Sequence, residues 1–112
     1  MKNDKSNKAM NIEIHSLGAR LDSFNYQEAQ DALLAIIEKG SNAILDMTAC
    51  NYVSSTGLRV LLSSKKMAEA KGLQLYLVGF SDEVRDIMEV TGFDNFFESF
   101  ATVDECLKAL AI

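Results

Sequence analysis

Three hydroxyl side chains stand in a row at Ser54, Ser55 and Thr56, immediately before a glycine. They lie between residues 43–47, which are apolar apart from one carboxylate, and residues 58–67, whose apolar side chains recur at helical spacing. The first backbone N–H groups of a helix have no partner inside it and carry a partial positive charge, so a hydroxyl caps well there and a phosphate is tolerated. The pattern therefore marks a strand-to-helix junction as the place to look for function.

Two interpretations of these hydroxyls stay open at this level. Ser and Thr are frequent at helix starts simply because their side chains replace missing backbone partners. Alternatively, Ser55 is a regulatory serine, because phosphorylation would add about −1.5 to −2 charges at one point. A partner protein packed against that serine would then face an unpaired, hydrated anion, and desolvating the anion would oppose binding.

The other residues that could do chemistry suggest structural roles. Asp46 ends the apolar run, and we expect its carboxylate to accept hydrogen bonds from the following loop, a role that Thr48 shares. Cys50 could be imagined as a nucleophile, but the single histidine, His15, is far away in the sequence, in a predicted strand. We therefore expect Cys50 to be a small, partly buried residue, and we predict no catalytic activity, no metal and no cofactor.

Length and composition predict one acidic domain. The chain has 112 residues, 48% of them hydrophobic, and a net charge of −5, which is the wrong sign for a nucleic-acid binder held by phosphate contacts. No apolar stretch approaches the roughly 20 residues of a membrane span or resembles a signal peptide, and Cys50 and Cys106 form no close pair. We expect a cytoplasmic protein with a flexible polar tail at residues 1–9 and one domain at residues 10–112.

Apolar periodicity predicts alternating strands and helices in the first half of the domain. Residues 11–17 alternate as a short strand does. Asn25 followed by Glu28 has the spacing of a helix N-cap with its reciprocal acid, and the helix is expected to run to about Lys39. Residues 43–47 are then typical of a strand buried on both faces.

The second half continues the alternation. The helix after the hydroxyls is expected to begin at Leu58 and to end at Gly72, and residues 73–78 predict another strand. The remaining expected elements are a helix capped by Ser81 or Asp82, a short strand at residues 97–99 within an aromatic cluster (Phe93, Phe96, Phe97 and Phe100), and a last helix that opens at Thr102. This order implies crossover units and an α/β fold with parallel neighbouring strands.

The chain resembles the STAS domain of bacterial anti-sigma factor antagonists over residues 12–110. Three segments carry the resemblance: AILDMTACNYVSSTGLRVLL from residue 43, LQLYLVGF from residue 73 and EVRDIMEVTGFD from residue 83. The resemblance implies a single STAS-like α/β domain with a mixed and largely parallel sheet of about four strands and about four packed helices. Its most specific part is Asp46 and Thr48 together with residues 54–58.

The resemblance also implies a function. In that family the serine two positions before the glycine is phosphorylated, which is Ser55 here, with Ser54 and Thr56 as alternatives. The unphosphorylated protein binds an anti-sigma factor that is also a serine kinase, and this binding releases a sigma factor. Phosphorylation by the kinase ends the binding, and a serine phosphatase reverses it. The implied partners are therefore proteins, with no nucleic acid and no membrane insertion.

Candidate partner contacts surround the junction. The family architecture also places the loop of residues 23–25 near it. The contacts that we expect are Asn51, Tyr52, Val53, Ser54, Thr56, Gly57, Arg59 and Ser63.

The sequence departs from the family pattern in two places. Many members carry Asp immediately before the phosphorylated serine, where this chain has Ser54. Members usually have a further strand at the start, whereas here a polar tail precedes Ile12, and Ala19 replaces a glycine before Arg20. These differences predict a changed environment for the acceptor hydroxyl and a shortened sheet edge.

Two other functions remain as alternatives. One is a STAS subunit of a lipid-transport or stress-signalling complex that binds constitutively through the same surface. The other is a small hydrolase or transferase that uses Ser55 or Cys50, although the sequence offers no base-bearing constellation for it.

Overall fold

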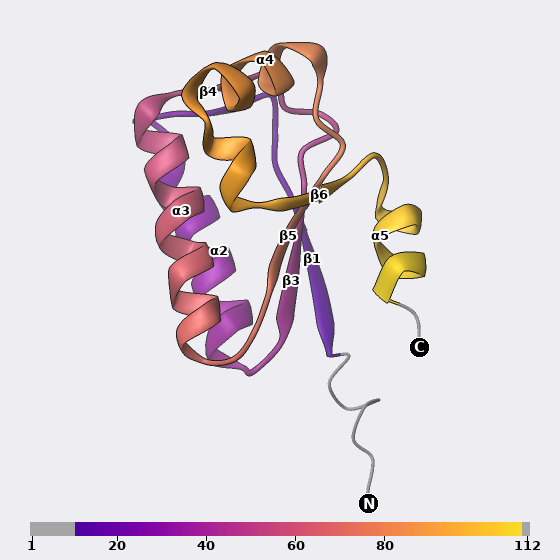
Figure 1. Ribbon diagram of the computed structural model, residues 1–112. Coiled ribbons are helices and arrows are strands. Elements are labelled where there is room, and N and C mark those ends of the chain that lie inside the picture. Colours follow the sequence, from indigo (N-terminus) through magenta and orange to yellow (C-terminus); the bar gives the residue numbers. More distant parts are fainter. Residues whose placement is uncertain (1–10, 111–112) are drawn as a thin grey trace, which may run out of the picture.

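The computed structural model describes residues 11–110, in which strands and helices alternate (Figure 1). The tail predicted for residues 1–9 lies outside the described residues, as do residue 10 and residues 111–112 of the predicted domain. In chain order the elements are β1 (Ile12–Ser16), β2 (Arg20–Leu21), α2 (Tyr26–Glu38), β3 (Asn42–Asp46), β4 (Tyr52–Val53), α3 (Ser55–Ala70), β5 (Leu75–Val78), α4 (Asp82–Thr91), the 3-10 helix η1 (Phe93–Phe96), β6 (Glu98–Phe100) and α5 (Val103–Leu110).

The central sheet has the strand order β1-β3-β5-β6, and every pairing among these described strands is parallel. The inner strands β3 and β5 are buried along their whole length, except for Asp46 at the end of β3. A parallel sheet covered on both faces requires continuous apolar strands, which explains the two apolar runs of the sequence. The predicted α/β class and the predicted number of strands and helices are confirmed. The mixed sheet that the resemblance implied is not found within residues 11–110, because each connection between neighbouring strands is a crossover that returns the chain in the same direction.

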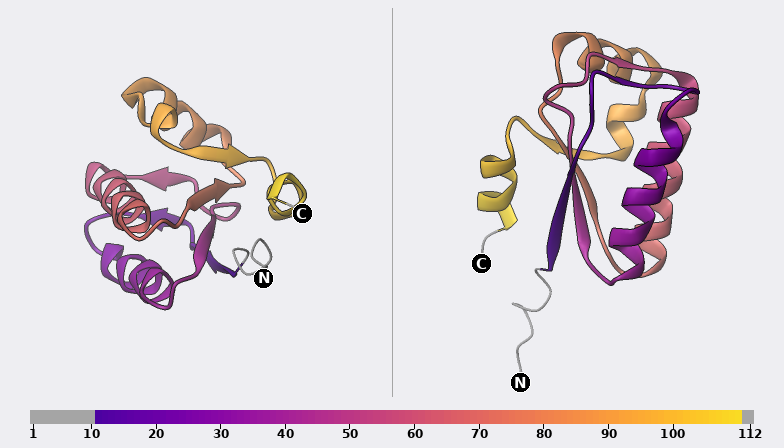
Figure 2. Two further views of the ribbon diagram at one scale, coloured as in Figure 1. Left: turned by 60° about the horizontal axis from the view of Figure 1, so that its bottom comes forward. Right: turned by 180° about the vertical axis from the view of Figure 1, so that it is seen from behind.

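Helices cover both faces of the sheet (Figures 1 and 2). α2 and α3 pack side by side on one face, and α5 lies against the other. Because successive side chains of a strand point to opposite faces, Leu45 and Leu77 enter the larger core with α2 and α3. Ile44 and Tyr76 enter the smaller core with Cys106 of α5.

The predicted cap of α2 is wrong. Asn25 does occupy the N-cap position, but its side chain makes no capping hydrogen bond. Its amide oxygen instead accepts from the backbone N–H of Asp22 at 2.8 Å, and its amide nitrogen donates to the carbonyl of Arg20 at 2.8 Å. The side chain therefore braces the loop before the helix, an alternative that sequence spacing alone could not reveal. The caps predicted at Ser81 and Thr102 are present, since their hydroxyls accept from Val84 and Glu105.

The aromatic cluster predicted around β6 is divided between different parts of the fold. Phe97 is buried in the larger core, whereas Phe100 packs on Tyr76 in the smaller one, with 6.2 Å between the ring centroids. Phe93 and Phe96 form an edge-to-face pair at 5.9 Å. Phe97 and Phe100 are three positions apart, and side chains separated by an odd number of positions in an extended segment point to opposite faces of the sheet.

Two short strands were not predicted from the sequence, and they form the base of the junction. β2 and β4 pair in parallel as a small separate sheet, in which Arg20 faces Tyr52 and Leu21 faces Val53. Strands of two residues have no periodicity that a sequence could show. α3 begins at Ser55, earlier than predicted, so that the glycine after the hydroxyls lies inside its first turn.

Gly57 allows the first turn of α3 to lie directly on this small sheet. A Cβ atom at Gly57 would stand 2.7 Å from the carbonyl oxygen of Leu21 and 2.9 Å from Cγ1 of Val53. Backbone atoms cannot move aside as a flexible side chain could. The close approach of α3 to β2 thus requires a residue without a side chain.

Replacing this glycine tests the contact. We expect Gly57→Ala to lower the free energy of unfolding by about 1–3 kcal/mol through overpacking, although alanine favours a helix interior. Urea denaturation measures the change. Gly18→Ala is the matched control, because a Cβ there meets no atom within 4 Å. Equal losses of stability in the two variants would show that the contact at Gly57 is not close.

Candidate functional site

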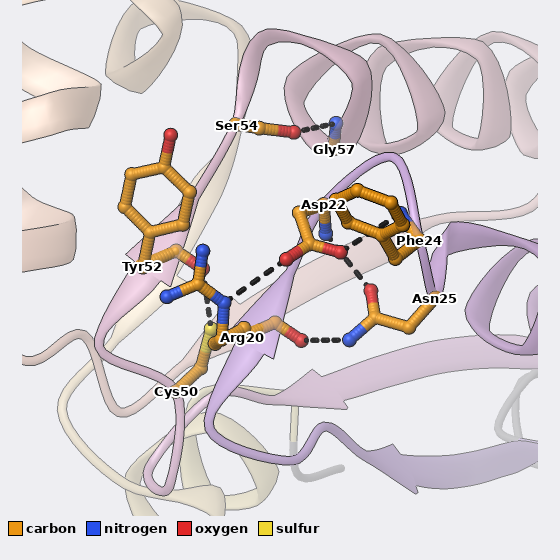
Figure 3. A network of polar contacts seen from close by, with 8 residues as sticks. All are labelled: Arg20, Asp22, Phe24, Asn25, Cys50, Tyr52, Ser54 and Gly57. Carbon is orange, nitrogen blue, oxygen red and sulfur yellow. Dashed lines mark hydrogen bonds and ion pairs between the residues drawn. The ribbon is translucent and has the colours of Figure 1, made fainter.

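Ser54 caps α3. Its hydroxyl accepts from the backbone N–H of Gly57 at 3.2 Å (Figure 3). Its carbonyl accepts from the N–H of Leu58 at 2.9 Å. Its own N–H donates to the carbonyl of Leu21 at 2.9 Å. The Ser54 side chain is half-buried, so its hydroxyl is engaged in holding the start of the helix.

Ser55 is the first residue of α3, and it is exposed. Within residues 11–110, the Ser55 hydroxyl makes no hydrogen bond. Thr56 is half-buried and lines a groove between α2 and α3. The row of three hydroxyls is therefore divided into a cap, a free hydroxyl and a partly covered one, and only Ser55 presents an accessible, uncommitted oxygen at the helix start.

Arg20 and Tyr52 join the two short strands beside the junction. The Arg20 guanidinium carbon lies 4.7 Å from the centroid of the Tyr52 ring, and its Nε donates to Asp22 at 3.0 Å (Figure 3). Beneath them Leu21 and Val53 are buried. Exposed side chains on one surface of this small sheet and apolar ones on the other give the junction a rigid base.

Asp22 fixes the loop that precedes α2. Its carboxylate accepts from Arg20 and from the backbone N–H of Phe24, at 2.9 Å, and these two hydrogen bonds, with that of Arg20 first, lower the pKa of Asp22. The Phe24 ring is 96% exposed. The loop is therefore held by hydrogen bonds while it displays an aromatic ring to solvent, which no sequence pattern indicated.

Asp46 and Thr48 shape the turn after β3. The Asp46 carboxylate accepts from the backbone N–H of Thr48 at 3.0 Å and from its hydroxyl at 2.5 Å. Gly79, at φ +79°, lies so close to Thr48 that a Cβ there would collide with the Thr48 hydroxyl. These contacts direct the chain from the sheet toward β4 and the junction.

The residues proposed as partner contacts fall into three groups. Four of them are exposed, namely Asn51, Tyr52, Arg59 and Ser63, and two are half-buried, namely Ser54 and Thr56. Val53 and Gly57 are buried and can only support the surface from below. The reason is that the pleat of β4 and the close approach at Gly57 turn both residues inward.

The described residues offer little for catalysis. Within residues 11–110, no group of three His, Cys, Asp or Glu side chains could hold a metal ion. The Cys50 side chain is fully buried and donates to the carbonyl of Tyr52 at 3.4 Å, and burial raises the pKa of its thiol. A thiolate nucleophile is therefore disfavoured at Cys50.

Among residues 11–110, no helix has the length and apolar character needed to span a membrane.

Comparisons with known proteins identify the domain. The STAS domain family matches residues 7–106. A relative from Bordetella bronchiseptica named "Putative anti-sigma factor antagonist BtrV" is 34% identical over 79 residues, which cover 69% of this chain and 67% of the relative.

Solved structures share the fold. An anti-sigma-factor antagonist (STAS) domain protein from Planctomyces limnophilus superimposes with a TM-score of 0.79 at 19% identity, covering 90% of this chain and 91% of that one. The anti-sigma factor antagonist SpoIIAA in its unphosphorylated form gives a TM-score of 0.75 at 19% identity, covering 89% and 88%. The match to the family, the level of identity and the arrangement of elements agree, and the chain belongs to the STAS domain family.

Proposed function

We propose that this domain is an anti-sigma factor antagonist that works by partner switching. In its unphosphorylated form it binds an anti-sigma factor that is also a serine kinase, and a sigma factor is released. The kinase phosphorylates Ser55, the complex dissociates, and a serine phosphatase restores the binding form. The domain is a substrate and a binding module in the cytoplasm, without catalytic activity of its own.

The accessible hydroxyl of Ser55 is the observation that supports this proposal. A kinase must reach its acceptor, and Ser55 is exposed, with a hydroxyl that makes no hydrogen bond within the described residues. Ser54 is committed to the N–H of Gly57, so its phosphorylation would remove the cap of α3. Thr56 is half-buried. Ser55 is therefore favoured over the two alternative acceptors.

A phosphate on Ser55 would act on the complex and leave the domain folded. At the start of α3 the phosphate oxygens lie near backbone N–H groups that have no intrahelical partner, and the helix dipole favours an anion there. In a closed interface the same doubly charged group would have to lose its hydration, at a cost of several kcal/mol. Because about 1.4 kcal/mol changes affinity tenfold, this cost is enough to end binding.

Ser54 in place of the aspartate common in the family fits this switch. Its neutral hydroxyl performs the capping that a carboxylate would otherwise provide. A phosphate on the next residue therefore meets no negative charge at the cap, and like-charge repulsion does not oppose the phosphorylated state.

Phosphorylation of this chain is the direct test. The probe is a purified anti-sigma factor of the serine-kinase class from the same organism, together with ATP. We expect intact-mass and peptide analysis to find one added phosphate, on Ser55, and Ser55→Ala to prevent it. We expect Ser55→Asp to weaken kinase binding about a hundredfold or more in calorimetry, since it places an anion in the interface.

Ser99→Asp is the matched control, because it adds the same charge at an exposed position of β6, away from the junction. It should bind as the wild type does. Phosphate found elsewhere in the chain would overturn the assignment of Ser55. Binding that Ser55→Asp leaves unchanged would favour the alternative of a STAS subunit that associates constitutively with a lipid-transport or stress-signalling complex.

A further inference from the structure

A cation-bearing groove runs beside Ser55, between α2 and α3. Its volume is about 600 Å³, and none of its lining residues is acidic. Tyr26 of α2 and Leu62 of α3 give it an apolar floor, and Arg59 and Lys66 of α3 stand along it two helical turns apart. Thr56, the neighbour of Ser55, lines its end.

The charges of the chain are segregated in a way that makes this groove unusual. Residues 82–110 contain eight acidic and two basic residues, while α3 contains three basic residues and one acidic residue. Lys65 of α3 is paired with Glu69, and α2 carries three acidic residues, none of which lines the groove. The charged side chains that do line the groove, Arg59 and Lys66, are both positive, in a protein of net charge −5. Electrostatic complementarity steers association and suppresses binding of partners with the same sign of charge.

Arg59 is the one arginine of the described residues without a partner. Arg20 is paired with Asp22 and lies over Tyr52, and Arg85 lies over the ring of Phe80. Within residues 11–110, the Arg59 side chain makes no hydrogen bond, ion pair or ring contact, and the residue is exposed. Its guanidinium is thus available to an external carboxylate.

We propose that this groove receives an acidic amphipathic segment of the kinase, that Arg59 pairs with one of its carboxylates, and that a phosphate on Ser55 competes for the same guanidinium. This inference rests on the proposed function and adds the chemistry of the partner and the regulation of the site. The apolar floor accepts the apolar face of the segment, and Arg59 and Lys66 match acidic residues on its edge.

The geometry of α3 makes the competition direct. Ser55 and Arg59 are four residues apart, so their side chains are neighbours on the helix surface, with the acceptor of the phosphate on the N-terminal side. This is the favourable order for an anion and a cation at that spacing. A phosphate on Ser55 therefore pairs with the Arg59 guanidinium, which is then no longer available to the carboxylate of the partner. The phosphate also places an anion in the interface.

The intramolecular pair can be tested without the kinase. Phosphoserine is incorporated at position 55 of the full chain by genetic encoding, and the second pKa of the phosphate is followed by ³¹P NMR. We expect this pKa to be lower in the wild type than in Arg59→Gln, and the difference to vanish at about 1 M salt, where screening is strong. Lys66→Gln, two turns farther from the junction, should leave the pKa at the wild-type value.

The backbone N–H groups at the start of α3 shift the phosphate pKa equally in the wild type and in both variants. A difference in this pKa between the wild type and Arg59→Gln therefore reports the interaction with Arg59 alone. A phosphate pKa that is the same in the wild type and in Arg59→Gln would overturn the competition for Arg59. This result would leave the proposed function intact, because release of the kinase could still follow from repulsion alone.

Binding measurements test the acidic partner segment. With the same purified kinase and the unphosphorylated chain, we expect Arg59→Glu to lower affinity about tenfold or more, and affinity to fall as salt rises. Lys71→Glu is the matched control, since it makes the same charge change at the end of α3, outside the groove, and should change affinity less than about twofold. Equal effects of the two reversals, or affinity independent of salt, would overturn the proposal.

Discussion

The whole junction depends on the close contact between the first turn of α3 and the backbone of β2. Ser54 donates its N–H to the carbonyl of Leu21, and that same carbonyl lies where a side chain of Gly57 would be. A single peptide group thereby fixes where the helix starts and how near it lies to the loop before α2. Without this contact, the start of α3 and the loop that carries Phe24 would move independently, and a partner that binds both would have to order them at an entropic cost.

Most of the fold follows from local patterns because it is built from long periodic segments. The apolar runs that form β3 and β5 are buried only if both faces of the sheet are covered. The helices that follow these strands have apolar faces and cover the sheet. The sequence also predicted a strand-to-helix boundary at the three hydroxyls, and an exposed Ser55 lies there. This boundary was predictable because hydroxyl residues at a helix start are a local signal.

The missing parts of the prediction are those that depend on contacts between distant segments. β2 and β4 are two residues long and exist because each finds the other. Asn25 had the right spacing for a cap, yet hydrogen bonds to the chain before it took precedence. The same long-range contacts make Val53 and Gly57 supports instead of contact residues, and they hold the ring of Phe24 in solvent. Propensity cannot describe such positions, because tertiary structure decides them.

The division of the three hydroxyls explains how a modification could change binding without changing the fold. A charge added to the residue that caps the helix would alter the hydrogen bonds that start α3, whereas Ser55 lies one position later and holds nothing in place. The anion would also sit where the helix dipole favours it, so that the stability of the domain need not fall. If Ser55 is phosphorylated as proposed, the modification is expected to lower the affinity for the partner and to leave the fold unchanged. Loss of the phosphate alone would then return the domain to its first state, because no element would have to refold.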